Sequence, residues 1–244
     1  MCGRFVSASP PDEIAKYFDA QLGETLLDPD DPMAPSYNVA PTNEVFVVLE
    51  SGETRRVETM RWGLVPFWAK DLSVGAKMIN ARAETIATKN AFKRSLAKRR
   101  CIIPADGFYE WKKVPGQKAK QPMYIHRADG DRFAFAGLWE IWRNPDKPDD
   151  EPLHTCTIIT GAANDAIAPV HDRMPVMLPP EKWDTWLDPE VRDLALVSKL
   201  LVPAPASIIA MHPVSTEVNR VGNKGASLIE PVPEAPAADQ TTLG

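Results

Sequence analysis

The sequence predicts a single α+β domain with an antiparallel β-sheet or barrel-like core and flanking helices. Apolar runs rich in Val, Ile, Phe and Trp recur along the chain, separated by Gly, Pro or Asp, as is typical of strands. These runs do not alternate regularly with helical patterns, as the strands of a parallel sheet would, and no internal repeat is present. A chain of 244 residues can also bury a sizeable core without disulfides or a structural metal.

Eight apolar runs are expected to form strands. Most of the 24 prolines fall at the edges of such runs, where they keep each element short. A further strand, rich in aromatic residues, is expected after Asp106-Gly107, a pair typical of a tight turn. The eight runs lie at residues 45–49, 56–62, 101–103, 123–126, 132–142, 155–160, 174–178 and 207–211.

Three segments have helical patterns. The first opens at residues 9–12, where Ser9 is expected to cap a first turn that contains proline. The second spans about residues 83–98 and carries basic side chains around two apolar positions four residues apart. The third is expected to open at residues 188–190, with one apolar face formed by Leu194, Val197 and Leu201.

Two segments are predicted to lie outside the packed core. Residues 144–151 form a polar, acidic stretch typical of a surface loop. Residues 232–244 are rich in Pro and Ala and end in polar residues, which predicts a disordered tail. The folded domain is therefore expected to span residues 2–231.

Charge and cysteine content limit the function classes. The formal net charge of −5 argues against a protein that coats nucleic acid generally, so any DNA contact must come from a local basic patch. No apolar run reaches the ~18 residues of a membrane-spanning helix, and the N-terminus lacks the layout of a secretory signal. Three scattered cysteines do not form a disulfide framework, so the reducing cytoplasm is the expected compartment. A monomer is expected, associated with the nucleoid when it is bound to DNA.

Cys2 is the first candidate for chemistry. Cysteine is small enough for a preceding methionine to be removed, which leaves an amine and a thiol on adjacent carbons. Such a 1,2-aminothiol condenses with an aldehyde to an imine, and the thiol then closes a thiazolidine ring. An internal cysteine cannot do this. At pH 7 an α-amine with an ordinary pKa of about 7.7–8.0 is already partly neutral.

A cysteine at position two is, on its own, more often an ordinary residue of a frayed terminus. Here Phe5 and Val6 follow almost at once and require burial. A strand at this point would hold Cys2 in a fixed pocket, where a nearby carboxylate or imidazole could accept protons from it.

A basic segment could bind DNA near such a site. Residues 77–100 contain eight basic residues and one acidic residue, Glu84, a local net charge of +7. Its lysines are best interpreted as a solvated helix face. Arg82 precedes the expected helix and offers a planar fork suited to phosphate, while Asn80 beside it offers both a donor and an acceptor.

Glu110 and His171 are the candidate acid–base residues. Glu110 lies between Tyr109 and Trp111, so it is either an outward-facing strand residue or a partly desolvated base with a raised pKa. His171 has even odds of a structural role or of acid–base work. Arg173, two residues later, would share its face in an extended segment and could hold a phosphate. Cys/His spacing for a zinc site is absent, and no metal or cofactor is expected.

Aromatic, proline-containing loops add a stacking surface. The segments 37–42 and 62–69 carry more apolar bulk than a plain connector needs, and Pro41 and Trp68 are the candidates for contact with single-stranded DNA. Trp62 is expected instead to fill the core.

Together these segments resemble the SRAP family, whose members crosslink to abasic sites in single-stranded DNA and are described as SOS response-associated peptidases. The resemblance covers about residues 2–231 in order. Its motifs are Met1-Cys2-Gly3-Arg4-Phe5, Tyr37-Asn38-Val39-Ala40-Pro41-Thr42, Trp62-Gly63-Leu64-Val65-Pro66, Asn80-Ala81-Arg82-Ala83-Glu84-Thr85, Arg100-Cys101-Ile102-Ile103-Pro104-Ala105-Asp106-Gly107-Phe108-Tyr109-Glu110-Trp111, Ala136-Gly137-Leu138-Trp139, His171-Asp172-Arg173-Met174-Pro175 and Val218-Asn219.

The resemblance implies roles for several residues. Cys2 is the implied nucleophile, and Asn80, Glu110 and His171 are its implied partners in the active site. The implied phosphate contacts are Arg4, Arg82 and Arg173. The expected function is a covalent thiazolidine link to the abasic sugar, with weak abasic-site lyase activity and peptidase activity limited to removal of Met1.

Two other classes remain open from the sequence. A cysteine peptidase or glutamine amidotransferase would use Cys2 as an N-terminal nucleophile that attacks an amide. A non-enzymatic DNA-binding module would not need Cys2 at all.

Overall fold

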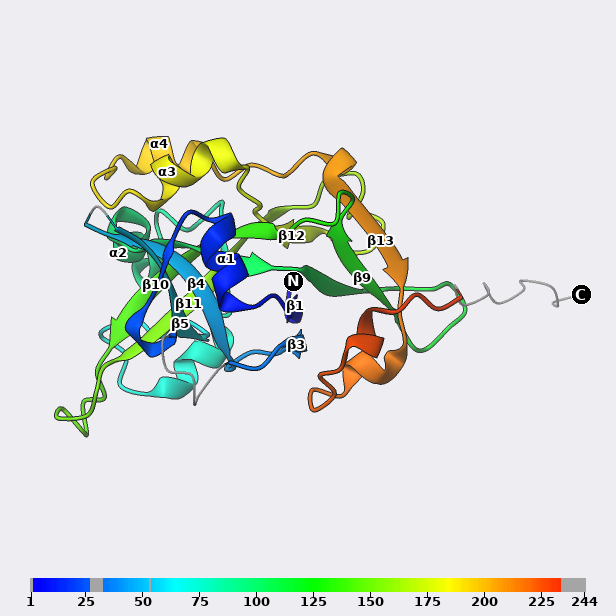
Figure 1. Cartoon of the computed structure of the whole chain (residues 1–244), viewed down its shortest axis with the longest axis horizontal. Helices are drawn as coiled ribbons and strands as arrows, with labels where there is room; N and C mark the ends of the chain where they lie inside the picture. The colour runs from blue at the N-terminus through cyan, green and yellow to red at the C-terminus, as the bar shows by residue number, and fades with distance from the viewer. Residues whose placement is uncertain (1, 27–32, 53, 234–244) are drawn as a thin grey trace, which may run out of the picture.

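The computed structural model describes residues 2–26, 33–52 and 54–233 and contains a closed five-stranded β-barrel, whose labelled strands lie on the left in Figure 1. Its antiparallel pairings run in the order β11–β10–β7–β4–β5. The barrel closes because β5 and β11 also pair, in parallel, at Arg61–Thr155 and Trp62–Cys156. These strands are β4 (Glu44–Ser51), β5 (Thr54–Trp62), β7 (Arg100–Ala105), β10 (Phe133–Trp142) and β11 (Leu153–Ala162).

Three short strands extend the barrel wall. One pairs in parallel with β5, and two pair with β11, one parallel and one antiparallel. Because both neighbours of β11 lie at its carboxyl end, residues from three separate parts of the sequence meet there. The short strands are β2 (Gln21–Leu22), β6 (Asn80–Arg82) and β12 (Arg173–Pro175).

A second, five-stranded antiparallel sheet packs against the barrel. Its order is β13–β9–β8–β1–β3, so the N-terminal strand lies between two partners rather than at an edge. Side chains from this sheet and from the barrel interior form one core cluster. The strands are β1 (Phe5–Ser7), β3 (Ser36–Val39), β8 (Gly107–Lys112), β9 (Gln121–Arg127) and β13 (Ile209–Pro213).

The chain passes from the barrel to this sheet at Asp106-Gly107. The predicted tight turn is wrong, since β7 and β8 belong to different sheets and do not pair. Asp106 instead accepts hydrogen bonds from the backbone amides of Ala8 (2.7 Å) and Ser9 (3.0 Å). A Cβ at Gly107 would lie 2.4 Å from the Tyr124 ring, so glycine is required here for close approach.

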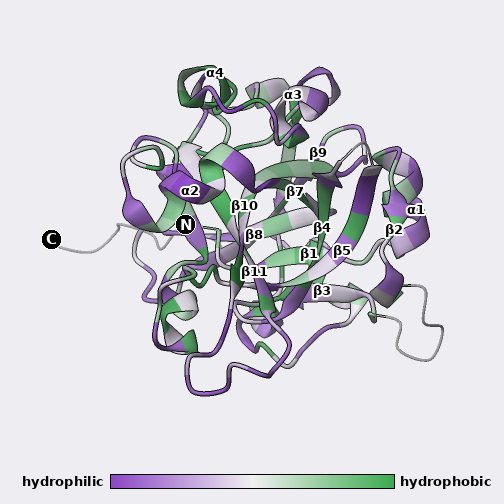
Figure 2. Cartoon of the chain, turned by 90° about the vertical axis from the view of Figure 1, so that its left-hand side faces the viewer, coloured by the Kyte–Doolittle hydropathy of each residue, from purple (hydrophilic) through white to green (hydrophobic). Residues whose placement is uncertain are grey.

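Helices cover the outer wall of the barrel, where a second apolar cluster forms between them and the strands. Strand interiors are largely hydrophobic and the surrounding loops hydrophilic (Figure 2). The α-helices are α1 (Pro11–Tyr17), α2 (Asn90–Lys98), α3 (Trp183–Leu187) and α4 (Leu194–Lys199). The 3-10 turns are η1 (Glu24–Leu26), η2 (Leu72–Lys77), η3 (Pro180–Lys182), η4 (Ala206–Ile208), η5 (Thr216–Asn219) and η6 (Ala226–Ile229).

The α+β fold class and the first helix are confirmed, with corrections to several bounds. Ser9 does not cap α1, because its hydroxyl bonds to Asp106 instead. The second helix begins at Asn90 rather than 83, after a series of turns. The third begins after Asp193, whose carboxylate accepts from two amides of the first turn, so a start at residues 188–190 is wrong.

All eight apolar runs overlap strands or bridges, but two of them end early or start late. The run at 174–178 is a strand only to Pro175, and the run at 207–211 begins in a 3-10 turn. Residues 144–151 form an exposed loop almost throughout, as expected. Of the tail predicted at 232–244, residues 234–244 lie outside the described residues. Within the described ranges, no helix is long and apolar enough to cross a membrane.

Candidate active site

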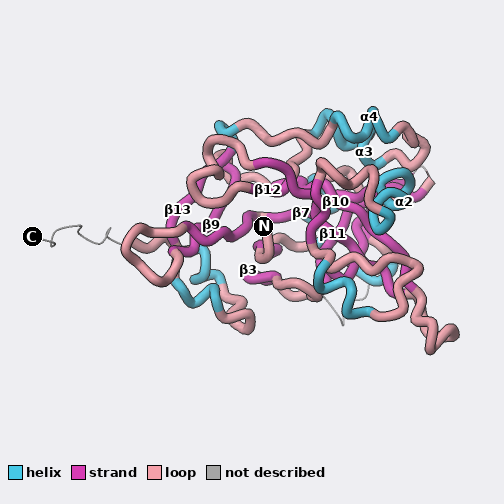
Figure 3. Tube along the Cα trace, turned by 180° about the vertical axis from the view of Figure 1, so that it is seen from behind, coloured by secondary structure: helices cyan, strands magenta, loops and turns pink. Residues whose placement is uncertain are grey.

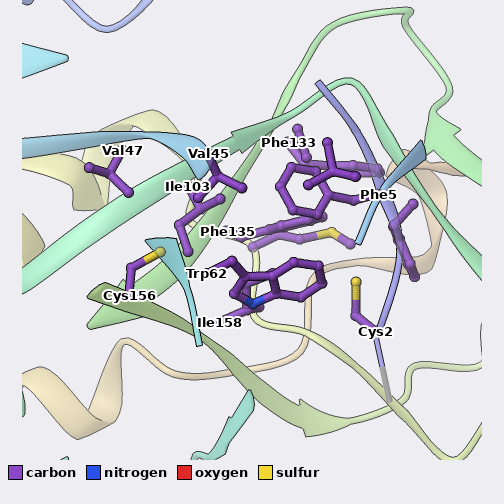
Figure 4. Close-up of a cluster of buried hydrophobic side chains, with 14 of the residues drawn as sticks. Cys2, Phe5, Val45, Val47, Trp62, Ile103, Phe133, Phe135, Cys156 and Ile158 are labelled. Carbon is purple, nitrogen blue, oxygen red and sulfur yellow. The ribbon is translucent and has the colours of Figure 1, made fainter. Parts of the chain in front are cut away.

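Cys2 is fixed at the start of the N-terminal strand. Its side chain is fully buried in the core cluster shared by the barrel and the second sheet. Figure 4 shows its sulfur directed toward the indole of Trp62, beside Phe5. The Phe5 and Trp62 rings meet edge to face with centroids 5.2 Å apart. Burial, and then the negative charge of Glu110, raise the pKa of the Cys2 thiol well above its ordinary value.

Glu110 faces the same core as Cys2. Phe108 on the same strand lies in the shared core cluster, and alternation along a strand places Glu110 on that face. The backbone amide of Tyr109 donates to the carbonyl of Arg4 (3.0 Å), which sets β8 alongside the first residues of the chain. Glu110 is only 3% exposed, so of the two interpretations the buried one holds. Burial raises the pKa of this carboxyl, and electrostatic interactions with the N-terminal amine and then with His171 act against that rise.

Asn80 contacts Cys2 directly. It begins β6, which pairs in parallel with β11 at Ile158. Its side-chain amide donates to the carbonyl of Cys2 at 2.9 Å. Its Oδ1 is buried and has no hydrogen-bond partner within the described part of the chain, so an acceptor is left over beside Cys2.

His171 lies at the entrance to β12. A turn holds it there, since its amide donates to the carbonyl of the buried Ile167 (3.0 Å). Its Nδ1 accepts from the amide of Arg173 (3.0 Å) and lies 2.9 Å from a carboxylate oxygen of Asp172. The His171 side chain is 27% exposed, so it lies between the buried residues and solvent.

The four predicted active-site residues therefore come together. Asn80 contacts Cys2 directly, the charge of Glu110 acts on the Cys2 thiol, and the charge of His171 acts on Glu110. They are contributed by the start of the chain and by three separate strands or strand entrances.

Arg4 is held by protein groups. Its guanidinium donates to the side chain of Asn38 (3.0 Å) and to the carbonyls of Val218 (2.7 Å) and Asn219 (3.4 Å). The last two belong to a segment, residues 216–224, that we call the C-terminal strap. The sequence did not predict this strap as a partner of Arg4.

Asn38 fastens the same strap, and the sequence did not single it out as a functional residue. It is fully buried, and its amide donates to the carbonyls of Val218, Arg220 and Asn223 at 3.0–3.1 Å. Lys224 in turn donates to the backbone carbonyl of Asn38. The only sequence signal was its place between Tyr37 and Val39 in a motif of the resemblance.

The two arginines beside β11 differ in their surroundings. Arg82 is exposed at the end of β6. Arg173 forms a two-pronged ion pair with Glu84 (2.8 and 2.9 Å) and also donates to the carbonyl of Thr160 (2.6 Å). Hydrogen bonding to Arg173 lowers the pKa of Glu84. The sequence counted Glu84 as the one acidic residue of the segment but not as the partner of Arg173.

Pro41 and Trp68 differ in exposure. Trp68 is 54% exposed, whereas Pro41 is half-buried in the turn before β4. Thr42, the next residue, has φ +73°, a strained conformation for a β-branched residue. Trp62 is fully buried and its indole donates to the carbonyl of Ile79, as expected for a core residue. The described residues contain no group of three or more side chains placed to bind a metal ion.

The structure combines a β-barrel, a second sheet packed against it, and a buried cysteine near an asparagine, a glutamate and a histidine. This combination indicates one family of proteins. The chain belongs to the SRAP family: it matches the family described as SOS response associated peptidase (SRAP) over residues 1–221. One similar protein is abasic site processing protein YoqW of Bacillus subtilis, 44% identical over 230 residues that cover 94% of this chain and 99% of that protein.

Another relative and two solved structures are similar to this chain over most of its length. Abasic site processing protein YedK of Escherichia coli is 36% identical over 95% of this chain and 100% of its own length. A crystal structure of a Bacteroides thetaiotaomicron protein has the same fold, with a TM-score of 0.84, 24% identity and coverage of 95% of this chain and 100% of that one. A Bordetella bronchiseptica protein superposes with a TM-score of 0.70 at 26% identity, covering 88% and 100% of the two chains.

Proposed function

We propose that this protein binds abasic sites in single-stranded DNA and joins itself to them covalently through Cys2, which shields the lesion. The observation that supports the proposal is the hydrogen bond from Asn80 to the Cys2 carbonyl (2.9 Å), with the buried Glu110 close enough to act on the Cys2 thiol and with His171 partly exposed. The family and the names of its relatives support abasic-site processing as the general activity.

The chemistry requires that Met1 be removed, so that Cys2 carries the free α-amine. The abasic sugar opens to its aldehyde, and the amine adds to C1′. Loss of one water gives an imine. The Cys2 sulfur then adds to C1′ while its proton passes to the imine nitrogen, and a thiazolidine ring results. The balance is one aldehyde and one aminothiol giving one thiazolidine and one water, so no oxidant or cofactor is needed.

Each partner has a role that suits its surroundings. Glu110, whose buried carboxyl has a raised pKa, accepts the proton of the α-amine and orients it. His171, partly exposed, transfers the proton that opens the sugar ring. Asn80 holds the Cys2 carbonyl, and its remaining Oδ1 accepts a hydrogen bond from the sugar. If ring closure is slow, the imine also permits loss of a C2′ proton and elimination of the 3′ phosphate, a weak lyase activity.

The DNA strand would be held by the predicted basic and stacking residues. Arg82 is exposed and takes a phosphate directly. Arg173 takes one by exchanging the Glu84 carboxylate for it. Arg4 already donates to three protein groups, so only its remaining N–H groups can contact a phosphate. Its main effect is to fix the first strand. Trp68, and to a lesser degree Pro41, offer apolar surface to the neighbouring bases.

The alternative is a cysteine peptidase or amidotransferase, which begins with attack by a thiolate. That class is disfavoured because the Cys2 thiol is fully buried and its pKa is raised, so it is protonated before substrate arrives. In the crosslinking route the amine attacks first and the thiol is needed only afterwards. Self-removal of Met1 remains a secondary activity of the proposal.

The test uses abasic single-stranded DNA and purified protein whose intact mass shows loss of Met1. Wild-type protein should form a heat-stable adduct, and Cys2→Ala should form none. Cys101→Ala and Cys156→Ala are matched controls, because both cysteines are buried in the same core cluster. An adduct that persists in Cys2→Ala, or a wild-type protein that reacts with Met1 in place, would contradict the proposal. Turnover of a peptide or of glutamine without DNA would favour the alternative.

A further inference from the structure

Two histidine rings lie against each other outside the candidate active site. His126 on β9 and His212 on β13 have ring centroids 5.4 Å apart, with their planes inclined at 60°. In the antiparallel register His212 lies opposite Tyr124, so His126 is its diagonal neighbour on the same face of the sheet. Both histidines are half-buried, so part of each remains accessible to solvent. Figure 3 shows β9 and β13 side by side, on the far side of the N-terminus from α2.

Backbone carbonyls fix which nitrogen of each ring is protonated. His126 Nδ1 lies 2.9 Å from the carbonyl oxygen of Arg127, and His212 Nε2 lies 2.8 Å from the carbonyl oxygen of Ile229. A carbonyl oxygen only accepts hydrogen bonds, so each of these nitrogens must be the donor. In the neutral rings the other nitrogens, His126 Nε2 and His212 Nδ1, therefore carry lone pairs.

This pattern is the one that metal-binding histidines have. A histidine ligand binds the ion through one ring nitrogen and donates its other N–H to a carbonyl or carboxylate, which fixes the tautomer and the orientation of the ring. Both rings already have such a carbonyl partner. Tyr124 restrains them further, because its ring stacks on His126 with centroids 5.3 Å apart and meets His212 edge to face at 5.5 Å.

The spacing of the rings fits one ion between them. Imidazole nitrogen binds Zn²⁺ at about 2.0–2.1 Å, which places each ring centroid about 3 Å from the ion, and a tetrahedral angle then separates two centroids by about 5 Å. The observed separation is 5.4 Å. Imidazole nitrogen suits Zn²⁺, Ni²⁺ and Cu²⁺, whereas Mg²⁺ and Ca²⁺ prefer oxygen ligands. The pair is therefore suited to a transition metal.

We propose that His126 Nε2 and His212 Nδ1 together bind one divalent transition-metal ion, with water in its remaining coordination positions. Two side chains make a weaker and more open site than a full set of zinc ligands, and the described residues hold no larger group of metal-binding side chains. Neither histidine takes part in the proposed crosslinking chemistry. The two residues lie far apart in sequence and meet only through the β9–β13 pairing, so motif spacing does not reveal them.

The ion would also fasten the C-terminal part of the chain. Coordination at Nδ1 of His212 keeps its Nε2 protonated, and this N–H donates to Ile229, the last residue of η6. Beside it, the amide of Val232 donates to the carbonyl of Pro213 (2.9 Å). The two histidines are held side by side only when β9 and β13 are paired, so the ion binds the folded protein more tightly than the unfolded chain and stabilises it.

The experiment measures the melting temperature of metal-free protein with added Zn²⁺, and with Mg²⁺ for comparison. Saturating Zn²⁺ should raise the melting temperature of wild type by a few degrees, and Mg²⁺ should not. His126→Phe and His212→Phe keep an aromatic ring but remove the ligating nitrogen, so both should lose the increase, whatever their melting temperature without metal. His154→Phe is the matched control, because His154 packs against Trp139 away from the pair, and it should keep the increase.

A second set of measurements separates this site from Cys2, whose free thiol is itself a ligand for soft metals. Cys2→Ala should keep the Zn²⁺-dependent increase. Electron paramagnetic resonance of Cu²⁺-loaded Cys2→Ala protein should show coupling of the copper to two imidazole nitrogens. The proposal is overturned if either phenylalanine variant of the pair keeps the increase, if Cys2→Ala abolishes it, or if the copper couples to one imidazole only. These measurements use no DNA, so a failure of the proposed crosslinking leaves their outcome intact.

Discussion

Burial raises the pKa of the Glu110 carboxyl, and this has a cost to stability. The folded-state pKa of Glu110 is raised above the ordinary 4.5, so the folded protein binds this proton more tightly than the unfolded chain. Below the ordinary pKa the group is protonated in both states and costs nothing. As the pH rises past it, the unfolded chain ionises first and the folded state becomes relatively less stable.

Replacing Glu110 by Gln should therefore stabilise the protein at pH 8 and have little effect near pH 4. The measurement is urea unfolding of wild type and variant at both pH values. Glu44→Gln, at an exposed position, should change stability equally at the two pH values. The same Glu110→Gln protein should crosslink slowly, and wild-type crosslinking should fall as the pH drops through the raised pKa. A stability difference that is the same at pH 4 and pH 8 would contradict the assignment.

Glu84 occupies the fork of Arg173 as a phosphate would. The pair is half-exposed, with Glu84 51% and Arg173 15% accessible, so it should be worth at most about 1 kcal/mol. Glu84→Gln should therefore raise affinity for single-stranded DNA by about two- to fivefold. Fluorescence anisotropy checks this. Glu190→Gln breaks a comparable ion pair with Arg192 and should leave affinity unchanged. A loss of affinity in Glu84→Gln would mean that Glu84 orients Arg173 rather than competing with DNA.

Among the secondary-structure elements, the strands can be predicted from the sequence, whereas the bends and the helix start discussed below cannot. Alternation of apolar and polar residues identifies a strand, because neighbouring residues point to opposite faces of the sheet. The bend at Asp106-Gly107 depends on Ala8, Ser9 and Tyr124, which lie far away in sequence, and a local motif cannot reveal them. The delayed start of α2 has no comparable local signal either.

The strap is the element whose function no local pattern predicted. Residues 216–224 form a short 3-10 turn and loop, yet they hold Arg4 and Asn38 through backbone carbonyls. Carbonyl acceptors carry no sequence signature, because every residue has one. For the same reason the sequence does not predict that Arg4, which the family resemblance implies as a phosphate contact, is bonded to the strap.

Asn38→Ala should loosen this strap. Three carbonyls would lose a buried donor, and we expect a loss of about 3 kcal/mol of unfolding free energy. Urea unfolding measures the loss. Asn144→Ala in the exposed loop should cost less than about 0.5 kcal/mol. Crosslinking by Asn38→Ala, measured well below its melting temperature, should also be slowed, since Arg4 and the first strand are no longer fixed. Full stability in Asn38→Ala would rule out the clamp.

At the scale of the whole molecule, the chain is acidic, so binding of DNA must depend on a local cluster of basic residues. The four candidate active-site residues could be predicted individually from motifs, but their convergence depends on strand register. Asn80 meets Cys2 only because β6 pairs with β11, and Glu110 faces the core only because β8 lies next to β1. Such pairings are non-local, and neither composition nor periodicity determines them.

The salt dependence of DNA affinity tests the role of these basic residues. Affinity for single-stranded DNA should fall as salt is added, and Arg82→Ala should reduce the slope of log affinity against log salt by about one phosphate contact. Titrations at several salt concentrations give both slopes. Arg56→Ala should keep the wild-type slope. An unchanged slope in Arg82→Ala would remove Arg82 from the phosphate contacts.

The strap joins the first residues of the chain to some of its last, and this has a consequence for biosynthesis. Arg4 cannot reach Val218 and Asn219 until nearly the whole polypeptide has left the ribosome. Until then the first residues of the chain are not held by the strap. In the folded protein Cys2 is fully buried. We therefore expect Met1 to be removed most readily before folding is complete, whichever peptidase activity removes it, so that a chain that folds with Met1 in place should mature slowly.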